Sequence, residues 1–256
     1  MFRFILLAAL AIAAATACAP LSAGPLVRVD VVDRDAAQTL PRYRHRGEDW
    51  IAGEPGAPYA VRLTNNTAER VLVVLSVDGV NAVTGQTADP SQAGYVLAPW
   101  QTTEVTGWRK SLEGVARFVF TDLPDSYAAR TGRPDNVGVI GIAAFRERRA
   151  VRRPPHPPAP VADAARAPVP AAGAAMGERA LARQAQQIGT GHGSHEVSRV
   201  GRASFVRASS RPAQVTELRY DAPQRLAALG IPVHRHPRYA GGPRPQAFPG
   251  GFVPDP

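Results

Sequence analysis

The stretch "RVLVVLSVDGV" (Arg70 to Val80) decides the fold class that the sequence predicts. Its first part is an apolar run rich in Val and Leu, and it ends at Asp78-Gly79, a dipeptide typical of tight hairpin turns. A short apolar run bounded by a turn signal is typical of a strand that is buried on both faces. This stretch therefore predicts a β-hairpin whose first strand lies in the middle of a sheet.

Shorter runs of the same kind lie on both sides of this hairpin. Each is rich in Val, Ile, Thr or aromatic residues, and turn residues separate them, as in an all-β domain. They are "LVRVDVV" (Leu26 to Val32), "YAVRLTNNT" (Tyr59 to Thr67), "TTEVTGW" (Thr102 to Trp108), "VARFVFT" (Val115 to Thr121) and "NVGVIGIAAF" (Asn136 to Phe145). Residues 25–148 therefore predict a mainly β domain, either an antiparallel β-sandwich or a jelly-roll-like fold. In its last strand, Gly138 and Gly141 are expected to let a neighbouring layer approach closely.

The rest of the chain predicts three further segments. Residues 149–175 are rich in Pro and Ala, which favours a disordered linker. Residues 176–232 predict a small α+β module that docks on the sandwich. Its expected elements are a helix over Gly177–Ile188, two strands that could pair at Ala203–Ser209 and Val215–Tyr220, and a helix with Asp221 as N-cap and Gly230 at its C-terminal end. Residues 233–256 predict a disordered tail.

The first residues resemble a bacterial export signal. Arg3 precedes an apolar stretch, Phe4 to Ala17, that is too short to span a bilayer as a helix, which needs ~20 residues. The stretch "AATAC", which ends at Cys18, resembles a lipobox, although Ala15 stands where that motif usually has Leu. Removal of residues 1–17 as a signal peptide and lipidation of Cys18 would also account for the lone thiol, whereas ordinary cleavage would leave it free. The expected location is therefore the outer membrane, through a lipid anchor on Cys18, and the alternative is a soluble periplasmic or secreted protein.

The net charge of +9 lies in the second half of the chain. Residues 24–148 hold 15 acidic and 14 basic residues, whereas residues 149–256 hold 6 acidic and 15 basic residues. A basic segment beside a neutral domain favours contact with an anionic surface. The expected partner of the basic C-terminal half is an anionic component of the cell envelope, and no pattern indicates a specific nucleic-acid site.

Several stretches together resemble a group of exported Gram-negative bacterial proteins that has no assigned function. They are "SVDGVNAVTG", "GYVLAPW" with "GWRKS", "SYAARTG" with "NVGVIGIAAF", and, after the linker, "GTG" and "FVRASSRP". The resemblance extends over most of Val61 to Ile231 outside the linker. It implies export and a β-rich domain with a trailing module, and it implies no catalytic residues.

The stretch "DSYAARTGRPDNVGVIGIAAF" (Asp125 to Phe145) raises the question of a catalytic site, because a Ser lies beside an Asp. A serine nucleophile needs a base, which is usually a His, and the β domain offers only His45. A hydrolase that uses the Asp125–Asn136 loop with His45 is therefore the alternative function. The favoured interpretation is structural: short polar side chains of this loop, Asp125, Asp135 and Asn136, bond backbone groups and hold the last strand in register.

The stretch "YRHRGEDW" (Tyr43 to Trp50) interleaves aromatic and basic side chains, a pattern that can stack on sugars or bases. On a strand, Tyr43 and His45 would face opposite to the arginines, which favours a half-buried strand with a charged outer face. The candidate ligand contacts are Tyr43, Arg44 and Trp50 here, and Tyr127 and Arg130 in the loop above.

Tryptophans and histidines give two further signals. Trp100 and Trp108 lie near strand ends, where Trp usually closes the end of a sandwich, although an exposed pair would suggest glycan binding. The segment "GTGHGSHE" (Gly189 to Glu196) holds three side chains that zinc could use, namely His192, His195 and Glu196. The zincin order H-E-x-x-H is absent, so a glycine-rich turn is expected there instead.

These features together predict a non-catalytic protein of the cell envelope. The sequence holds no coherent set of nucleophile, base and metal ligands, so no catalytic residue, metal or cofactor is predicted. The expected function is that of a lipid-anchored binding or scaffold module.

Overall fold

The Asp-Gly hairpin is present and belongs to one sheet of a sandwich. In the computed structural model, which describes residues 24–149 and 186–233, strand β6 (Val71–Val77) turns at Asp78-Gly79 into strand β7 (Val80–Asn81). The φ angles of Asp78 and Gly79 are 53° and 72°, the left-handed conformation that a type I′ turn requires at both positions. Strand β6 is buried along almost its whole length, as predicted.

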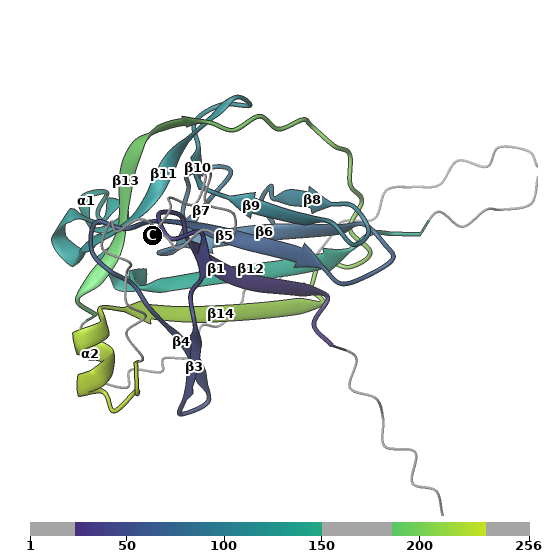
Figure 1. Cartoon of the computed structure of the whole chain (residues 1–256). Helices are drawn as coiled ribbons and strands as arrows, with labels where there is room; N and C mark the ends of the chain where they lie inside the picture. Colours follow the sequence, from purple (N-terminus) through teal and green to yellow (C-terminus); the bar gives the residue numbers. More distant parts are fainter. Residues whose placement is uncertain (1–23, 150–185, 234–256) are drawn as a thin grey trace, which may run out of the picture.

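The strands form two seven-stranded sheets (Figure 1). The first sheet has the order β10 (Gly107–Arg109), β11 (Gly114–Asp122), β5 (Pro58–Asn65), β1 (Val27–Asp33) and β2 (Gln38–Thr39), with β13 (Ile188–Val197) paired to β11 and β9 (Thr102–Val105) paired to β5. The second has the order β3 (Arg42–His45), β4 (Glu48–Ala52), β14 (Gln214–Asp221), β12 (Val139–Arg146), β6 and β7, with β8 (Tyr95–Leu97) paired to β6. The predicted mainly β sandwich is confirmed. Its one departure from a purely antiparallel arrangement is the parallel pair of β4 and β14.

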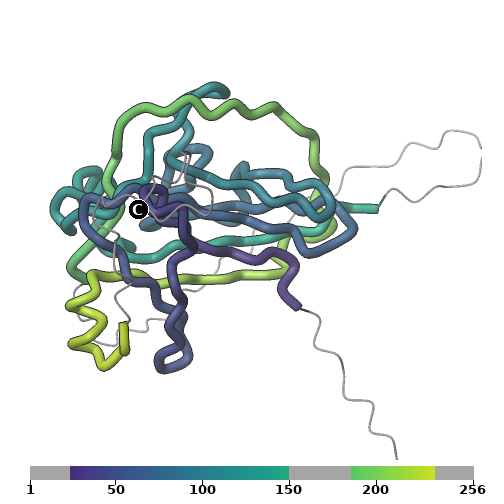
Figure 2. The backbone as a smooth tube through the Cα atoms, viewed as in Figure 1, coloured from purple at the N-terminus to yellow at the C-terminus, as the bar shows by residue number. Residues whose placement is uncertain are grey.

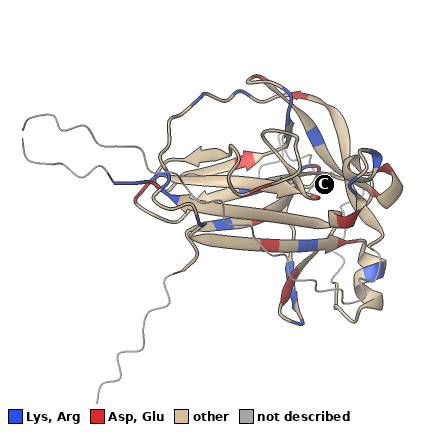
Figure 3. Cartoon of the chain, turned by 180° about the vertical axis from the view of Figure 1, so that it is seen from behind, with Lys and Arg blue, Asp and Glu red and all other residues tan. Residues whose placement is uncertain are grey.

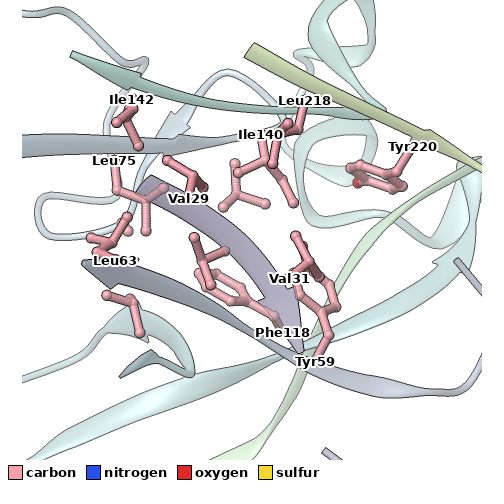
Figure 4. Packing of buried hydrophobic residues seen from close by; sticks show 14 of the residues in the cluster. Val29, Val31, Tyr59, Leu63, Leu75, Phe118, Ile140, Ile142, Leu218 and Tyr220 are labelled. Carbon is pink, nitrogen blue, oxygen red and sulfur yellow. The ribbon is translucent and has the colours of Figure 1, made fainter. Parts of the chain in front are cut away.

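The core lies between the two sheets (Figure 4). Alternate side chains of a strand point to one face, so β1 and β5 direct Val29, Val31 and Leu63 toward the second sheet. They meet buried side chains of β6, β12 and β14, namely Leu75, Ile140, Ile142 and Leu218. Burying a large aliphatic side chain stabilises the fold by about 1.5–3 kcal/mol, so this layer holds the two sheets together.

Residues 186–233 belong to the sandwich and do not form a separate module. Strand β13 pairs with β11 along the first sheet, and β14 lies between β4 and β12 in the second (Figures 1 and 2). Without β14, the facing backbone groups of both neighbours would lack partners. The boundary predicted at residue 148 therefore separates two parts of one folding unit, which corrects the expectation of a module docked on a complete sandwich.

Two elements of this part differ from the prediction. The segment "GTGHG" belongs to strand β13 and is not a turn, because it pairs with β11. Its first glycine, Gly189, lets the segment before β12 pack directly onto the strand. A Cβ atom on Gly189 would lie 2.5 Å from Val137 Cγ1 and 2.6 Å from Ser126 Cβ. The segment Ala203–Ser209 is not a strand either: its one ladder contact is an isolated bridge between Glu147 and Arg207, and β14 pairs with β12 and β4 instead.

Two short helices lie at one end of the sandwich (Figure 1), namely α1 (Tyr127–Arg130) and α2 (Pro223–Ala228). The N-cap of α2 is Ala222, so the predicted cap Asp221 is wrong by one residue. Gly230 has a φ angle of 80°, and the N–H of Ile231 donates to Leu226 O over 2.9 Å, which is the Schellman arrangement that ends a helix.

Several predicted segments lie outside the described residues. They are the signal peptide 1–17 with Cys18, the linker 149–175 beyond Arg149, most of the helix Gly177–Ile188, and the tail 233–256 beyond Val233. Ile188, the last residue of that predicted helix, begins strand β13. Within residues 24–149 and 186–233, no helix is long and apolar enough to cross a membrane.

Candidate functional site

The outer face of the second sheet carries a groove across strands β6, β12 and β14. Side chains that point away from the core form three rows across these strands: Val139 beside Arg219, Gly141 between Ser76 and Glu217, and Ala143 between Val74 and Val215. Most of this floor is apolar. Val215, near the start of β14, is 63% exposed and adds to this apolar surface.

Loops form the walls of this groove. Residues 87–90 line one side, and Asp135, Asn136 and Gln186 line the end near the 3-10 turn η2 (Pro134–Asn136). On the same face, toward the far end of β12, the Arg207 guanidinium lies 4.2 Å from the centre of the Phe145 ring and donates to Gln92 O over 2.6 Å. The groove has a volume of about 360 Å³, which is in the range of ligand-binding clefts.

Gly141 lies in the floor of the groove, and the fold does not require a glycine there. Its φ angle is not in the left-handed region, and a Cβ atom at this position would have a single neighbour within 4 Å, Thr216 O at 3.9 Å. A Cβ atom on Gly138, in contrast, would lie 2.3 Å from the amide of Gln186. The expectation that a neighbouring layer approaches both glycines is thus correct for Gly138 and wrong for Gly141. A strand glycine without a structural reason is typical of a place where a ligand comes close to the backbone.

The groove is acidic. Three carboxylates line it, those of Asp89, Asp135 and Glu217, against one guanidinium, that of Arg219. Arg219 Nε already donates to Glu48 Oε1 over 2.8 Å, and Glu48 is not part of the lining. Hydrogen bonds from Ser91 lower the pKa of Asp89, so its carboxylate stays ionised at neutral pH. The groove therefore favours a positively charged group above an apolar floor.

A second polar cluster lies inside the sandwich. The carboxylate of Asp78 accepts hydrogen bonds from the backbone N–H of Gly138 over 2.9 Å, the backbone N–H of Thr190 over 2.7 Å and the hydroxyl of Tyr220 over 2.6 Å. Tyr220 Oη is also 2.7 Å from Thr190 Oγ1, which is 2.6 Å from the hydroxyl of Tyr59. These hydroxyls form one chain that ends on Asp78 and joins β5 and β13 of the first sheet to the second sheet.

This cluster has a structural role. All four polar side chains are fully buried, and burial raises the pKa of Asp78 to about 6 although the hydrogen bonds from Tyr220 and the backbone oppose the rise. Because Asp78 bonds Gly138 N, it fixes the start of β12. The sequence predicted this role for Asp125, Asp135 and Asn136, and Asp78, from a distant hairpin, is a residue that it did not predict for it.

The candidate contacts on the hairpin of β3 and β4 pack against α2. Tyr43 lies opposite Trp50 in the ladder, and Trp50 is only 9% exposed in a cluster with Leu226 and Ile231. Arg44 Nη1 is 3.1 Å from the carboxylate of Asp49 on the exposed side. The predicted alternation of half-buried Tyr43 and His45 with exposed arginines is confirmed. The Trp50 ring is thus used for packing and is not available to a ligand.

The other two candidates lie on α1, outside the groove lining. The Tyr127 ring is partly buried between Trp108, at 5.0 Å, and His192, at 5.7 Å, and the Arg133 guanidinium lies 5.8 Å from it. Arg130 is exposed in the last turn of this helix. The groove lining includes none of the five candidates Tyr43, Arg44, Trp50, Tyr127 and Arg130.

The structure does not bring Ser126 and His45 together. Ser126 is fully buried, and its Oγ accepts the backbone N–H of Ala129 over 3.2 Å as the N-cap of α1. His45 lies near the tip of the hairpin of β3 and β4, which projects from the sandwich on a different side from α1 (Figure 1). This arrangement gives the serine no base among the described residues.

The three side chains considered for zinc have other contacts. His192 packs beside Tyr127, and His195 lies over Gly114, where a Cβ atom would be 2.1 Å from the imidazole. Glu196 accepts from Arg34 over 2.5 Å and from Arg117 over 2.6 Å. In the described part of the chain, no group of three or more His, Cys, Asp or Glu side chains could hold a metal ion.

The two tryptophans near strand ends differ. Trp108 is 3% exposed and packs edge-on against Phe118 with ring centres 4.8 Å apart, which confirms its expected place in the sandwich. Trp100 is 65% exposed, so it does not close the sandwich and the two do not form an exposed pair.

We expect Ser126→Ala to lower the free energy of unfolding by about 1 kcal/mol, because it removes the N-cap of α1. Asn136→Ala is expected to change it by less than about 0.5 kcal/mol, because the side chain is exposed and has no hydrogen bond among the described residues. Urea unfolding of both variants, followed by circular dichroism, tests this order. A larger loss for Asn136→Ala would show that the loop is held by a contact other than the cap.

Sequence reasoning missed the groove, although one signal pointed to it. In "VTELRY", Val215, Glu217 and Arg219 alternate with buried residues, so they had to share the outer face of a sheet. The sequence does not give the strand order, and the strand order determines which strands lie beside β14. It also places Gly141 between Glu217 and Ser76.

Comparison with known proteins adds no identification. No family model matches the chain, no curated protein matches it, and no solved structure matches it.

Proposed function

We propose that this protein is a non-catalytic binding module of the cell envelope that holds an extended, basic segment of a partner polypeptide in the groove on its second sheet. The observation that carries this proposal is the uncovered Gly141 in the floor of an acidic groove. A glycine in the middle of a strand destabilises it by roughly 0.5–1 kcal/mol relative to Ala. A ligand that occupies the space above Gly141 would explain why the strand has a glycine at this position.

The chemistry of the groove supports a basic partner. Lys and Arg side chains combine an aliphatic stem with a charged end, so the stem would lie on Val139, Ala143 and Val215 while the end reaches Glu217. The groove crosses β6, β12 and β14, and a partner segment in extended conformation would place alternate side chains on its apolar floor.

The sequence features at the N-terminus support the location. The apolar stretch before Cys18 and the lipobox-like "AATAC" favour export and a lipid anchor in the outer membrane. A module of this kind would hold its partner close to that membrane.

Gly141→Val is expected to raise the free energy of unfolding by about 0.5–1 kcal/mol, because a β-branched side chain suits a strand and a Cβ atom meets no clash here. The same change fills the groove and should weaken binding of a blocked Ala-Val-Lys-Val-Ala peptide at least about tenfold. Urea unfolding gives the first quantity, and isothermal titration calorimetry with this peptide gives the second.

Matched controls separate the groove from the rest of the surface. Gly201→Val also adds a side chain in open space, but outside the groove, and should leave peptide binding unchanged. The peptide Ala-Val-Glu-Val-Ala should not bind, because the groove is acidic. Equal binding of both peptides, or wild-type affinity in Gly141→Val, would contradict the proposal. A dimer in sedimentation experiments that Gly141→Val dissociates would also contradict it, because a second copy of the chain would then cover the groove.

A further inference from the structure

One end of the sandwich, opposite the end that carries α1 and α2, gathers segments that are far apart in sequence. The register places the start of β1 beside the end of β5, the start of β9 beside β5, and the end of β12 beside the starts of β6 and β14. The side-chain amide of Gln214 also bonds the backbone of Val27 with distances of 2.8 and 2.9 Å. We call this the Trp100 end; it consists of residues 24–27, 65–71, 97–102, 146–149 and 206–214.

Trp100 projects from this end into solvent. Its side chain is 65% exposed, whereas the other two tryptophans of the chain are 9% and 3% exposed. Its backbone has a φ angle of 60°, which is uncommon for a bulky residue, and its N–H donates to Thr67 O over 3.2 Å. The turn thus holds a large aromatic ring outward in a conformation that a smaller residue would adopt at less cost.

The same end of the sandwich carries an excess of positive charge. The Trp100 end contains six arginines (Arg70, Arg146, Arg148, Arg149, Arg207 and Arg211) and two acidic residues (Glu69 and Glu147). Arg149 and Arg146 pair with Glu69, and Arg70 pairs with Glu147 over 3.2 Å. Arg148 and Arg211 are exposed and have no ion pair among the described residues. Figure 3 shows basic positions where β12 ends at this side of the fold.

The start of the described chain lies at the same end. Asn66 bonds Leu26 O through its backbone N–H over 2.8 Å and Pro25 O through its side chain over 3.1 Å, and Thr67 beside it bonds Trp100. Gly24 is six residues after Cys18, and six residues of extended chain reach about 20 Å at most. A lipid on Cys18 would therefore hold the Trp100 end, and not the end with α1 and α2, next to the bilayer.

We infer that the Trp100 end docks on a bilayer that contains anionic phospholipids, with the Trp100 ring in the interfacial layer and the arginines against the phosphates. Trp favours the membrane interface, because its ring is apolar and its N–H is polar, and arginines near an anionic surface are attracted to it. The inference rests on the proposed lipid anchor for orientation, but its ring and its charges are properties of the sandwich alone.

Fluorescence tests the position of the ring, because Trp100 is the one exposed Trp of three. The full chain, purified from membranes, is reconstituted into vesicles of phosphatidylethanolamine and phosphatidylglycerol with brominated acyl chains. Bromine should quench wild-type emission and should leave the emission of Trp100→Phe, which comes from buried Trp50 and Trp108, unchanged. Equal emission of the wild type in brominated and plain vesicles would overturn the inference.

Vesicle partition tests the charges in a Cys18→Ser chain, which cannot be lipidated. Arg148→Gln with Arg211→Gln in this background should lower partition onto phosphatidylglycerol vesicles by about 25-fold, because each arginine contributes about fivefold. The matched control, Lys110→Gln with Arg130→Gln, removes the same charge outside the Trp100 end and should leave partition close to that of the parent. Equal loss in both pairs, or equal partition onto neutral phosphatidylcholine vesicles, would overturn the inference.

Together with metabolic labelling of Cys18 by a fatty-acid analogue, the two experiments also separate this inference from the anchor. If fatty-acid labelling fails at Cys18 but the Cys18→Ser chain binds anionic vesicles through Arg148 and Arg211, the surface stands without the anchor. If Cys18 is labelled and the wild type stays on vesicles with Trp100 unquenched, the anchor stands and the docking surface is wrong.

Discussion

Replacing Asp78 with alanine is expected to lower the free energy of unfolding at neutral pH by about 3 kcal/mol. The change leaves two buried donors, the N–H groups of Gly138 and Thr190, without this acceptor, and the hydroxyl of Tyr220 keeps only Thr190 Oγ1 as a partner. Each unpaired buried donor costs about 1–3 kcal/mol. Loss of the buried carboxylate offsets part of this, because burial disfavours its charged form. Urea unfolding followed by circular dichroism gives the difference.

The pH dependence separates the charge of Asp78 from its packing, and Asp78→Asn is the variant that keeps the shape. Burial raises the pKa of Asp78 from 3.8 to about 6, so the folded state binds the proton more tightly than the unfolded state. The contribution of this group to stability is full below about pH 4 and is lost as the pH rises to about 6. A pKa difference of about 2 corresponds to about 3 kcal/mol. Wild type should therefore gain about 3 kcal/mol over Asp78→Asn between pH 7 and pH 4.

A second aspartate in the following loop serves as the control. Asp89 is exposed, and hydrogen bonds from Ser91 lower its pKa, so protonation is not favoured by folding there. The wild type should therefore gain no stability relative to Asp89→Asn between pH 7 and pH 4. If the difference between wild type and Asp78→Asn is the same at pH 4 and pH 7, then Asp78 does not titrate in this window.

A chain that ends at Arg149 is expected not to fold. It lacks β14, which lies between β4 and β12, and β13, which covers β11. It also lacks the buried side chains Leu218 and Ile188 and two members of the hydroxyl chain, Thr190 and Tyr220. The expected result is the absence of a cooperative urea transition for residues 1–149 alone, and its return when residues 150–256 are co-expressed as a second chain.

Two variants of the second chain make this test specific. Leu218→Asp puts a charge in the core, since Leu218 is 1% exposed, and should prevent reconstitution. Val215→Asp places the same charge on the outer face of the same strand and should allow it. A cooperative transition in residues 1–149 without a partner chain would restore the domain boundary that the sequence predicts.

The sandwich could be predicted from the sequence because each of its main strands has a clear local pattern. Alternation in "LVRVDVV" and "VARFVFT" sets which side chains face inward, and Asp78-Gly79 sets the hairpin. Strand β13 was not predicted, because glycines have low strand propensity and their reason lies in another segment: Val137 and Ser126 pack where Gly189 has no side chain.

The candidate site could be predicted only in part, for a similar reason. A sequence cannot distinguish a glycine that admits a neighbouring layer, such as Gly138, from one that faces open space, such as Gly141, because both follow the same strand pattern. The sequence also predicts correctly that Asp78 is a turn residue. The burial of Asp78 could not be predicted, because it results from the approach of β13 and β14. Aromatic residues beside arginines suggested a ligand site, yet Trp50 packs under α2, which the sequence places far away.

The position of β14 also determines when folding can finish. This strand lies in the middle of the second sheet, yet it leaves the ribosome after all the other strands of residues 24–149 and 186–233. The ion pair between Arg219 and Glu48 joins residues 171 positions apart. Pairings over such separations form slowly, because the long intervening chain must first lose its freedom. The second sheet therefore stays incomplete until residues 214–221 have been synthesised. For a chain whose first residues resemble an export signal, this delay keeps most of the polypeptide unfolded, and so able to be threaded across a membrane, during nearly all of its synthesis.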